Sequence, residues 1–255
     1  HKVLTYPRTD SRHLPEDYLQ TSMQTLECLT GNAGYESYAS QILQNRWVRP
    51  NKRIFDNKKI SDHFAIIPTT QLPKNLSEPE QKLYDLVTRR FMAVFFPAAE
   101  FLVTTRFTEV AGHRFKSEGR VMTKPGWLAV YGREIPASGK NSDNDRLLVP
   151  VSPGEAVLAD KVLADELVTK PPARYTEATL LRAMETAGKL VDNDELRDAL
   201  KENGIGRPST RAAIIETLFK RNYIRKEKKN LIATPTGVEL IQIIHEELLK
   251  SAELT

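Results

Sequence analysis

Apolar side chains recur at helical spacing in two stretches of the amino-terminal part of the chain. Between residues 15 and 31 they fall three and four positions apart, with a proline in the first turn, which predicts a helix. A longer helix is expected to run to Pro97, because Ser77 and Glu80 have the spacing of a capping box at its start. Residues 44–75, between these helices, are basic and lack a regular period.

The period changes from helical to two in the middle of the chain. Apolar and β-branched side chains alternate with other residues from Phe101 to Phe107, and Ala111-Gly112 follows as a turn, which predicts a β-hairpin. Further short strands are expected through Trp127 to Val130. The stretch 135–145 is rich in Gly, Ser, Asn and Asp and predicts an exposed hairpin loop.

The carboxyl-terminal third is helical again after Pro171-Pro172, which marks a boundary. We expect helices at 176–188, 193–203 and 209–222, short strands at 223–224 and 231–233, and a final helix from residue 236. Helices followed by a small hairpin make a winged-helix-like arrangement, a common architecture for DNA binding. The fold class predicted for the whole chain is mixed and mainly α, with a β-rich middle segment.

Length and composition narrow the class of protein. The chain has 255 residues, enough for one large domain or for a few small ones. It contains no apolar run near the roughly 18 residues of a membrane span, and nothing that resembles a signal peptide. Its single cysteine, Cys28, excludes a disulfide framework or a zinc cluster within the chain. These features indicate a cytoplasmic protein. Because His1 is not an initiator residue, we expect a fragment of a longer protein.

The net charge is only +4, but basic residues gather in two stretches. Residues 46–59 contain six Lys or Arg and one acidic residue, and residues 207–229 contain eight against two. A phosphate backbone favours such stretches, because each neutralised phosphate releases counterions. Two solvated surface faces would give the same pattern, so charge alone leaves nucleic-acid binding open.

A tyrosine, arginines, a carboxylate and hydroxyls lie together in Tyr6-Pro7-Arg8-Thr9-Asp10-Ser11. A phenol with a pKa near 10 needs nearby positive charge or a base before it can attack at neutral pH. Arg8 is permanently charged, can hold a phosphate oxygen, and would stabilise the negative charge that builds during attack on phosphorus. An ordinary turn, with Asp10 or Ser11 capping the next helix, fits the same spacing.

His63 lies between Asp62 and an apolar run that ends at Pro68. A histidine in this position is most often a structural residue whose hydrogen bonds are satisfied. It can also donate to a phosphate, or titrate near neutral pH. The spacing leaves both roles open.

Two glycines and two arginines precede or open a predicted helix in the stretch from Gly204 to Arg211. Glycines before a helix let the backbone approach a phosphate, and the unpaired N–H groups of the first turn point at it. Arg207, Ser209 and Thr210 would add further donors. A plain helix cap after a turn is the alternative. No Walker motif is present, because neither Gly-Lys pair of the chain is followed by Ser or Thr, so ATP hydrolysis is not supported.

Three motifs, in this order, resemble those of type IA DNA topoisomerases, most closely the bacterial topoisomerase III branch. Thr5-Tyr6-Pro7-Arg8-Thr9-Asp10-Ser11 resembles the active-site signature of that family. Ser61-Asp62-His63-Phe64-Ala65-Ile66-Ile67-Pro68-Thr69 resembles its second motif, and residues 204–214 resemble its third. The resemblance covers nearly the whole chain.

The resemblance implies that Tyr6 attacks a phosphodiester of single-stranded DNA, forms a 5′-phosphotyrosine and releases a 3′-hydroxyl end. Arg8 would position and stabilise the scissile phosphate, and His63 would contact a phosphate nearby. A second strand then passes through the break before the tyrosine linkage reverses, so no ATP is needed. The residues expected to contact DNA are Thr9, Asp10, Ser11, His63, Arg207, Ser209, Thr210 and Arg211.

The family fold is a torus of several domains with winged-helix or CAP-like helical modules. By analogy, residues 1–98 are part of the tyrosine-bearing gate domain, 99–172 form a β-rich arch, and 173–255 form a helical DNA-binding base domain. Mg²⁺ is expected for the full-length enzyme, held by an upstream TOPRIM domain, and no metal is expected in this chain. The expected partner is single-stranded DNA, the enzyme is expected to be a monomer, and no membrane is involved.

Two hypotheses follow from the resemblance. The isolated fragment should bind single-stranded DNA without cleaving it. If Arg207, Ser209 and Arg211 hold the DNA backbone, Arg211→Ala should weaken binding uniformly and lower the salt slope by about one.

Two other protein classes share parts of the pattern. A non-enzymatic winged-helix DNA-binding protein would explain the carboxyl-terminal third and the basic stretches, but it leaves the Tyr6 motif unexplained. A tyrosine recombinase also combines a tyrosine with arginines. Its tyrosine usually follows those arginines near the end of the catalytic domain, whereas Tyr6 comes first.

Overall fold

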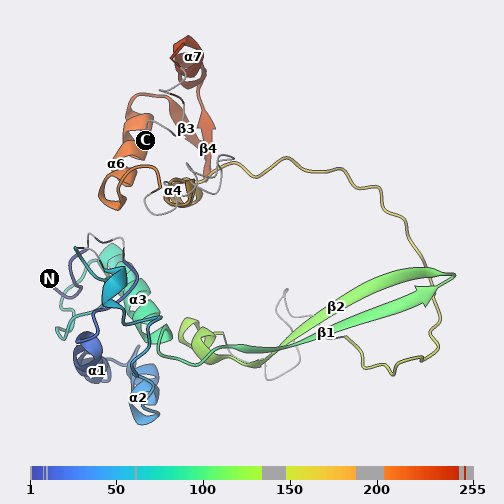
Figure 1. The fold of residues 1–255 in the computed structure, drawn as a ribbon, viewed down its shortest axis with the longest axis horizontal. Coiled ribbons are helices and arrows are strands. Elements are labelled where there is room, and N and C mark those ends of the chain that lie inside the picture. Colours follow the sequence, from blue (N-terminus) through green and yellow to red (C-terminus); the bar gives the residue numbers. More distant parts are fainter. Residues whose placement is uncertain are drawn as a thin grey trace. The chain divides into compact units, whose positions relative to one another are not determined.

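The computed structural model describes residues 2–7, 9, 11–60, 62–133, 148–187, 204–246 and 250. The chain divides into two compact units, residues 1–165 (unit 1) and 166–255 (unit 2), and each is described by itself (Figure 1). The described residues form helices and two separate two-stranded antiparallel sheets, so the predicted mixed fold class is confirmed. The three-domain division given above stays a prediction.

Unit 1 combines a helical body with a long hairpin. Its elements are α1 (Tyr18–Leu29), α2 (Glu36–Gln44), η1 (Asn57–Lys59), α3 (Glu78–Ala93), β1 (Glu100–Val110), β2 (His113–Lys124) and η2 (Gly126–Tyr131). The predicted capping box opens α3: both the N–H and the hydroxyl of Ser77 donate to the Glu80 carboxylate, at 2.8 and 2.6 Å. These bonds lower the pKa of Glu80.

The hydrophobic core of unit 1 lies among its helices and the irregular segments beside them. Leu26 of α1, Ile42 of α2 and Met92 of α3 are fully buried there. Leu14 and Phe55, which lie outside the α-helices, are buried in the same cluster. Burying a side chain of this size contributes about 1.5–3 kcal/mol. The core therefore holds the segments that flank the Tyr6 and His63 motifs against the helices.

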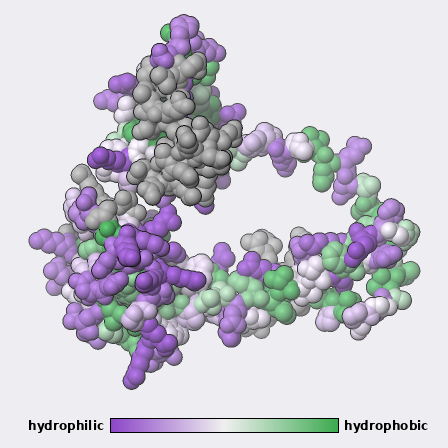
Figure 2. All heavy atoms as spheres, viewed as in Figure 1, coloured by the Kyte–Doolittle hydropathy of each residue, from purple (hydrophilic) through white to green (hydrophobic). Residues whose placement is uncertain are grey.

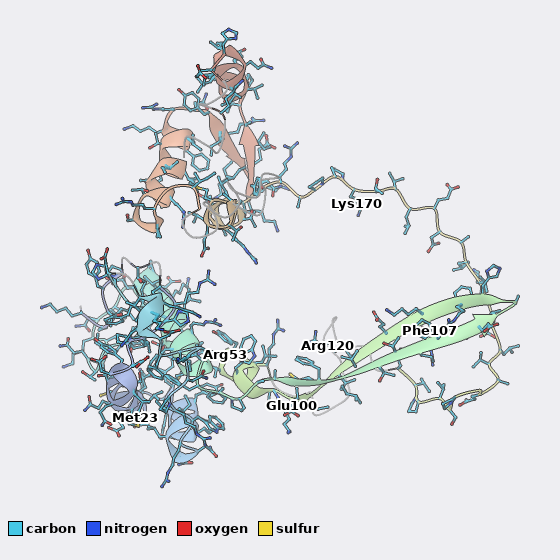
Figure 3. The ribbon with its side chains drawn as sticks, viewed as in Figure 1. Met23, Arg53, Glu100, Phe107, Arg120 and Lys170 are labelled. Atoms are coloured by element: carbon cyan, nitrogen blue, oxygen red, sulfur yellow. The ribbon has the colours of Figure 1, made fainter. Side chains whose placement is uncertain are left out.

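The hairpin has the turn that the sequence predicts, but most of its strand residues are exposed or only partly buried. β1 and β2 pair from Glu100 opposite Lys124 to Val110 opposite His113. Val103 and Phe107 remain 61% and 55% exposed. Figure 3 shows Glu100 at the foot of the hairpin and Phe107 farther along it, and Figure 2 shows hydrophobic residues on this part of the surface. The alternation predicted the strands correctly, although it does not correspond to one buried and one exposed face.

The strand expected from Trp127 to Val130 is wrong, because these residues form the 3₁₀ helix η2. Gly126 turns the chain with a φ of +48°, and the N–H of Trp127 donates to the carbonyl of Pro97 at 3.0 Å. A Cβ on Gly126 would lie 2.5 Å from the backbone of residues 97 and 98. After this tight turn residues 127–130 coil into a helix and do not extend as a strand, and Val130 is buried in the core.

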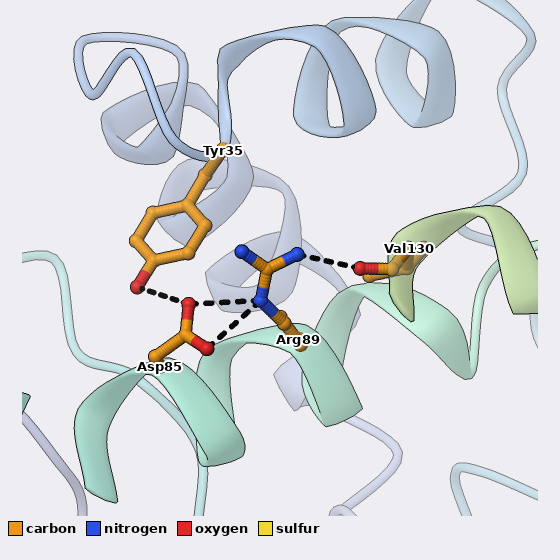
Figure 4. Close-up of polar contacts among 4 residues, drawn as sticks. All are labelled: Tyr35, Asp85, Arg89 and Val130. Atoms are coloured by element: carbon orange, nitrogen blue, oxygen red, sulfur yellow. Dashed lines mark hydrogen bonds and ion pairs between the residues drawn. The ribbon is translucent and has the colours of Figure 1, made fainter. Parts of the chain in front are cut away.

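A polar network attaches η2 to the helical body (Figure 4). The Nε of Arg89 lies 2.9 Å from both carboxylate oxygens of Asp85, and its Nη1 donates to the carbonyl of Val130 at 2.7 Å. The Tyr35 hydroxyl donates to Asp85 at 3.1 Å. Burial, followed by the Asp85 charge, raises the pKa of Tyr35, and the bond to Asp85 raises the pKa of Arg89.

Unit 2 contains α4 (Glu177–Glu185), α6 (Pro208–Lys220), β3 (Ile224–Glu227), β4 (Asn230–Ala233) and α7 (Pro235–Ile243). The predicted elements at 176–188, 209–222, 223–224 and 231–233 are confirmed within a few residues, as is the final helix. The helix expected at 193–203 and the loop expected at 135–145 lie outside the described residues. Helix, hairpin and helix follow in the predicted order, and the winged-helix assignment stays a prediction.

A buried threonine joins the hairpin of unit 2 to α7. The Thr234 hydroxyl donates to the carbonyl of Asn222 at 2.6 Å and accepts from the N–H of Gly237 at 3.1 Å, capping α7. A Cβ on Gly237 would lie 2.2 Å from the carbonyl of Tyr223, so α7 begins where only a glycine fits. Within the described ranges, no helix has the length and apolar character needed to cross a membrane.

Candidate active site around Tyr6

Two segments far apart in the sequence lie side by side and form the site. The N–H of Thr5 donates to the carbonyl of Ile67 at 2.9 Å, and the N–H of Thr69 donates to the carbonyl of Val3 at 3.0 Å. Leu4 and Pro68 form an antiparallel bridge between these bonds. The first and second sequence motifs are therefore paired with each other.

This pairing brings Tyr6 and His63 together at the surface. Their ring centroids lie 4.6 Å apart with an interplanar angle of 46°. Tyr6 is 55% exposed and His63 is exposed as well. The phenol is therefore open to solvent, with the imidazole directly beside it.

The hydroxyls of Thr9 and Ser11 are engaged within the protein. The Thr9 hydroxyl donates to the carbonyl of His63 at 2.8 Å, and the Ser11 hydroxyl donates to the carbonyl of Lys59 at 2.7 Å. The N–H of Ser11 in turn donates to the Thr9 hydroxyl at 3.0 Å. Both side chains hold the Tyr6 loop to the neighbouring segment, and their expected contacts with DNA stay predictions. Arg8 and Asp10 lie outside the described residues.

The first basic stretch adjoins the Tyr6 loop, which the sequence did not indicate. Besides the contact of Ser11 with Lys59, the N–H of Leu14 donates to the carbonyl of Ile54 at 2.7 Å. Lys58 and Lys59 are exposed, as is Arg53, which Figure 3 labels on the helical body. A basic segment more than forty residues away in the sequence therefore contacts the chain just after the tyrosine loop. The only sequence signal was that this stretch runs directly into the His63 motif.

The third motif lies in unit 2 and is built around a glycine turn. Gly204 has a φ of +64°, and a Cβ there would lie 2.3 Å from the carbonyl of Met184 at the end of α4. The N–H of Ile205 donates to that same carbonyl at 2.8 Å. The turn that precedes α6 is thus fixed by close contact of two backbones.

The polar residues of the third motif differ in exposure. Arg207, Ser209 and Thr210 are exposed at the start of α6, where the N–H of Arg207 donates to the Thr210 hydroxyl at 3.2 Å. Arg211 is only 8% exposed, and its Nε donates to the carbonyl of Ile205 at 3.0 Å. Arg211 therefore supports the glycine turn, while Arg207 and Ser209 lie where an anion can reach them.

Among the described residues, no three His, Cys, Asp or Glu side chains gather closely enough to hold an ion. The pairing of the first two motifs does not depend on a metal, because main-chain and hydroxyl hydrogen bonds carry it.

Known proteins resemble this chain along its whole length. The sequence model described as DNA topoisomerase matches residues 1–255. The chain belongs to the bacterial DNA topoisomerase family, in its type IA class. Within it the chain is topoisomerase III-like: DNA topoisomerase 3 of Bacillus cereus is 39% identical over 261 residues, and that of Bacillus subtilis is 37% identical over 260.

Both relatives are matched over 100% of this chain and 35% of their own length, so the chain spans about a third of the curated relatives. Among solved structures, full-length topoisomerase I from Thermotoga maritima aligns with 97% of this chain and 35% of its own, with a TM-score of 0.56. At 23% identity that likeness shows a shared fold.

Proposed function

We propose that this chain is the tyrosine-bearing part of a type IA topoisomerase, which opens one DNA strand, passes another through the gap and closes the break. The observation that carries the proposal is the pairing of the Tyr6 and His63 motifs, which presents an exposed phenol beside an imidazole. Family membership supports the same reaction. The product would be DNA of altered topology, through relaxation or decatenation.

In the proposed reaction the Tyr6 oxygen attacks the scissile phosphorus. An oxygen–phosphorus bond to Tyr6 forms, the bond from phosphorus to the 3′ oxygen breaks, the phenol proton leaves to a base or water, and the departing 3′ oxygen gains a proton. Arg8 stabilises the charge on the phosphoryl oxygens and His63 contacts the phosphate. One phosphodiester replaces another, so attack by the 3′-hydroxyl restores the strand without ATP.

The exposed cations beside the tyrosine loop support binding of a single DNA strand. Arg53, Lys58 and Lys59 would neutralise backbone phosphates on either side of the scissile one, and Arg207 with Ser209 would hold the backbone in unit 2. No contact of this kind reads base identity, so we expect binding with weak sequence preference.

Mg²⁺ would serve the full-length enzyme by supplying positive charge near the phosphate. By analogy with the family we place the ion in a TOPRIM domain outside this chain, and we assign no step of the Tyr6 chemistry to it here. The chain would then bind single-stranded DNA without cleaving it alone. We further propose that the protein acts as a monomer in the cytoplasm.

The test mixes end-labelled single-stranded DNA and Mg²⁺ with the chain alone, with the separately produced upstream part, and with both. A label that stays on the protein after denaturation only when both parts are present, and is lost in Tyr6→Phe, is the expected result. His13→Gln serves as a matched control, because it changes a nearby side chain outside the proposed chemistry. A covalent adduct that persists in Tyr6→Phe would overturn the proposed nucleophile.

A non-enzymatic winged-helix DNA-binding role is the second candidate, favoured by the helix, hairpin and helix order of α6, β3, β4 and α7. Competition between single-stranded and duplex DNA distinguishes the two. Preference for the duplex, with no adduct in the mixing experiment, would favour this role.

A further inference from the structure

Thr5, which directly precedes Tyr6, makes an unusual set of contacts. Its N–H donates to the carbonyl of Ile67 at 2.9 Å, as in a regular antiparallel pair. The N–H of Ile67, however, donates to the Thr5 hydroxyl at 2.9 Å, where a regular pair uses a main-chain carbonyl. The same hydroxyl lies 3.4 Å from the carbonyl of Ala65, to which it donates.

The Thr5 hydroxyl thus accepts the hydrogen bond from Ile67 that the Thr5 carbonyl would accept in a regular pair. The regular main-chain pairing ends at Thr5. Thr5 is partly buried, and the next residue, Tyr6, is exposed. A valine in this position would have nearly the same shape, but it could neither accept from Ile67 nor donate to Ala65.

A second hydroxyl attaches the chain on the other side of Tyr6. Thr9 donates to the carbonyl of His63 at 2.8 Å, so the loop that carries Tyr6 is held at both ends by threonine hydroxyls on the same partner segment. His63, whose ring lies against Tyr6, is part of that segment. The position of the phenol relative to the imidazole therefore depends on these two attachments.

We propose that Thr5 is a positioning residue for Tyr6: its hydroxyl fixes the point where the tyrosine leaves the paired segment and so aims the phenol oxygen at the phosphate. The inference rests on the function proposed above. Thr5 acts through Tyr6 and makes no contact with DNA. Displacing a reacting group by about 1 Å can lower a rate by about 100-fold, while the DNA affinity supplied by surrounding cations is unchanged.

The test uses the full-length protein and compares Thr5→Val with wild type. Single-turnover formation of the covalent adduct on an end-labelled single strand is measured together with the dissociation constant for that strand. We expect Thr5→Val to slow adduct formation by about 10- to 100-fold and to leave the dissociation constant within about twofold. Thr5→Ser, which keeps the hydroxyl, should restore most of the rate.

Thr30→Val is the matched control. It removes a threonine hydroxyl that donates to a main-chain carbonyl of the same unit, that of Glu27 at 2.7 Å, at the end of α1. Its rate should equal that of wild type. Thermal unfolding of each variant shows whether the fold is kept. If Thr5→Val unfolds, Thr5→Ala and Thr5→Ser decide, because they differ only in the hydroxyl.

An unchanged rate in Thr5→Val, or equal rates in Thr5→Ala and Thr5→Ser, would overturn the inference. So would a loss of DNA affinity that accounts for the whole loss of rate. These outcomes differ from failure of the proposed function, in which wild type itself forms no Tyr6-dependent adduct.

Discussion

Single residues in this chain show how burial changes the expected role of a charged side chain. Arg207 and Arg211 were indistinguishable in the sequence, since both flank the start of a helix. In the structure Arg207 is exposed, whereas Arg211 is buried and donates to the glycine turn. A cation that already supports the backbone is less available to a phosphate, so the two arginines should respond differently to substitution.

We predict that Arg207→Ala lowers the salt slope of single-stranded DNA binding by about one and leaves the stability of unit 2 nearly unchanged. Arg211→Ala should lower that stability by about 1–3 kcal/mol, because the carbonyl of Ile205 loses its charged donor. Salt-dependent binding and denaturant unfolding of both variants check this. If Arg211→Ala lowered the slope at unchanged stability, the original expectation of a direct phosphate contact would be favoured instead.

Among the elements, those with a local signal were predictable. The capping box set the start of α3, and the alternation with Ala111-Gly112 predicted the hairpin. The strand expected at 127–130 was wrong because a short apolar run fits a strand or a buried helical turn equally well, and it does not reveal the tight turn at Gly126. The association of the Tyr6 loop with Lys59 was not predictable either, because it depends on a pairing across distant segments. For the same reason Thr5 could not be recognised as more than part of a motif.

The junction of α3 with η2 gives a prediction for pH dependence. Burial and then Asp85 raise the pKa of Tyr35, so the folded state favours the neutral phenol. The unfolded phenol ionises near pH 10, so this contribution to stability is complete below about pH 10 and is lost as the pH rises further. Tyr35→Phe should therefore show a smaller fall in unfolding free energy between about pH 9 and 11 than wild type.

Urea unfolding of unit 1 at several pH values measures this effect. At neutral pH Tyr35→Phe should cost about 1 kcal/mol for the lost hydrogen bond to Asp85. Tyr131→Phe, a change at a more exposed tyrosine of the same unit, is the control. A steeper alkaline fall in Tyr35→Phe than in wild type would contradict the assigned cause.

At the scale of the whole molecule, the division into two units can be tested by limited proteolysis. Along the chain, the boundary between the units falls between residues 165 and 166. It lies in a stretch from 151 to 175 that has no helix or strand and is exposed throughout. Few buried contacts hold such a segment, so its backbone should open to proteases more readily than α3 or α6.

We predict that limited trypsin digestion cuts first at Lys161 or Arg174 and leaves both units resistant. Mass spectrometry of the early fragments identifies the cut sites. Early cleavage after Arg90 in α3 or Lys220 in α6 would show instead that the units are less stable than the stretch between them.

Because η2 is attached to α3, a rotation of α3 should move the whole hairpin with it. The bond from Arg89 to the buried Val130 holds η2, at the foot of the hairpin, to α3, and the two strands of the hairpin are 11 and 12 residues long. At about 3.4 Å per residue such an arm is about 37 Å long. A tilt of α3 by about 5° would then displace the turn at Gly112 by about 3 Å, so a spectroscopic label placed there would magnify small rotations of the helical body that presents Tyr6.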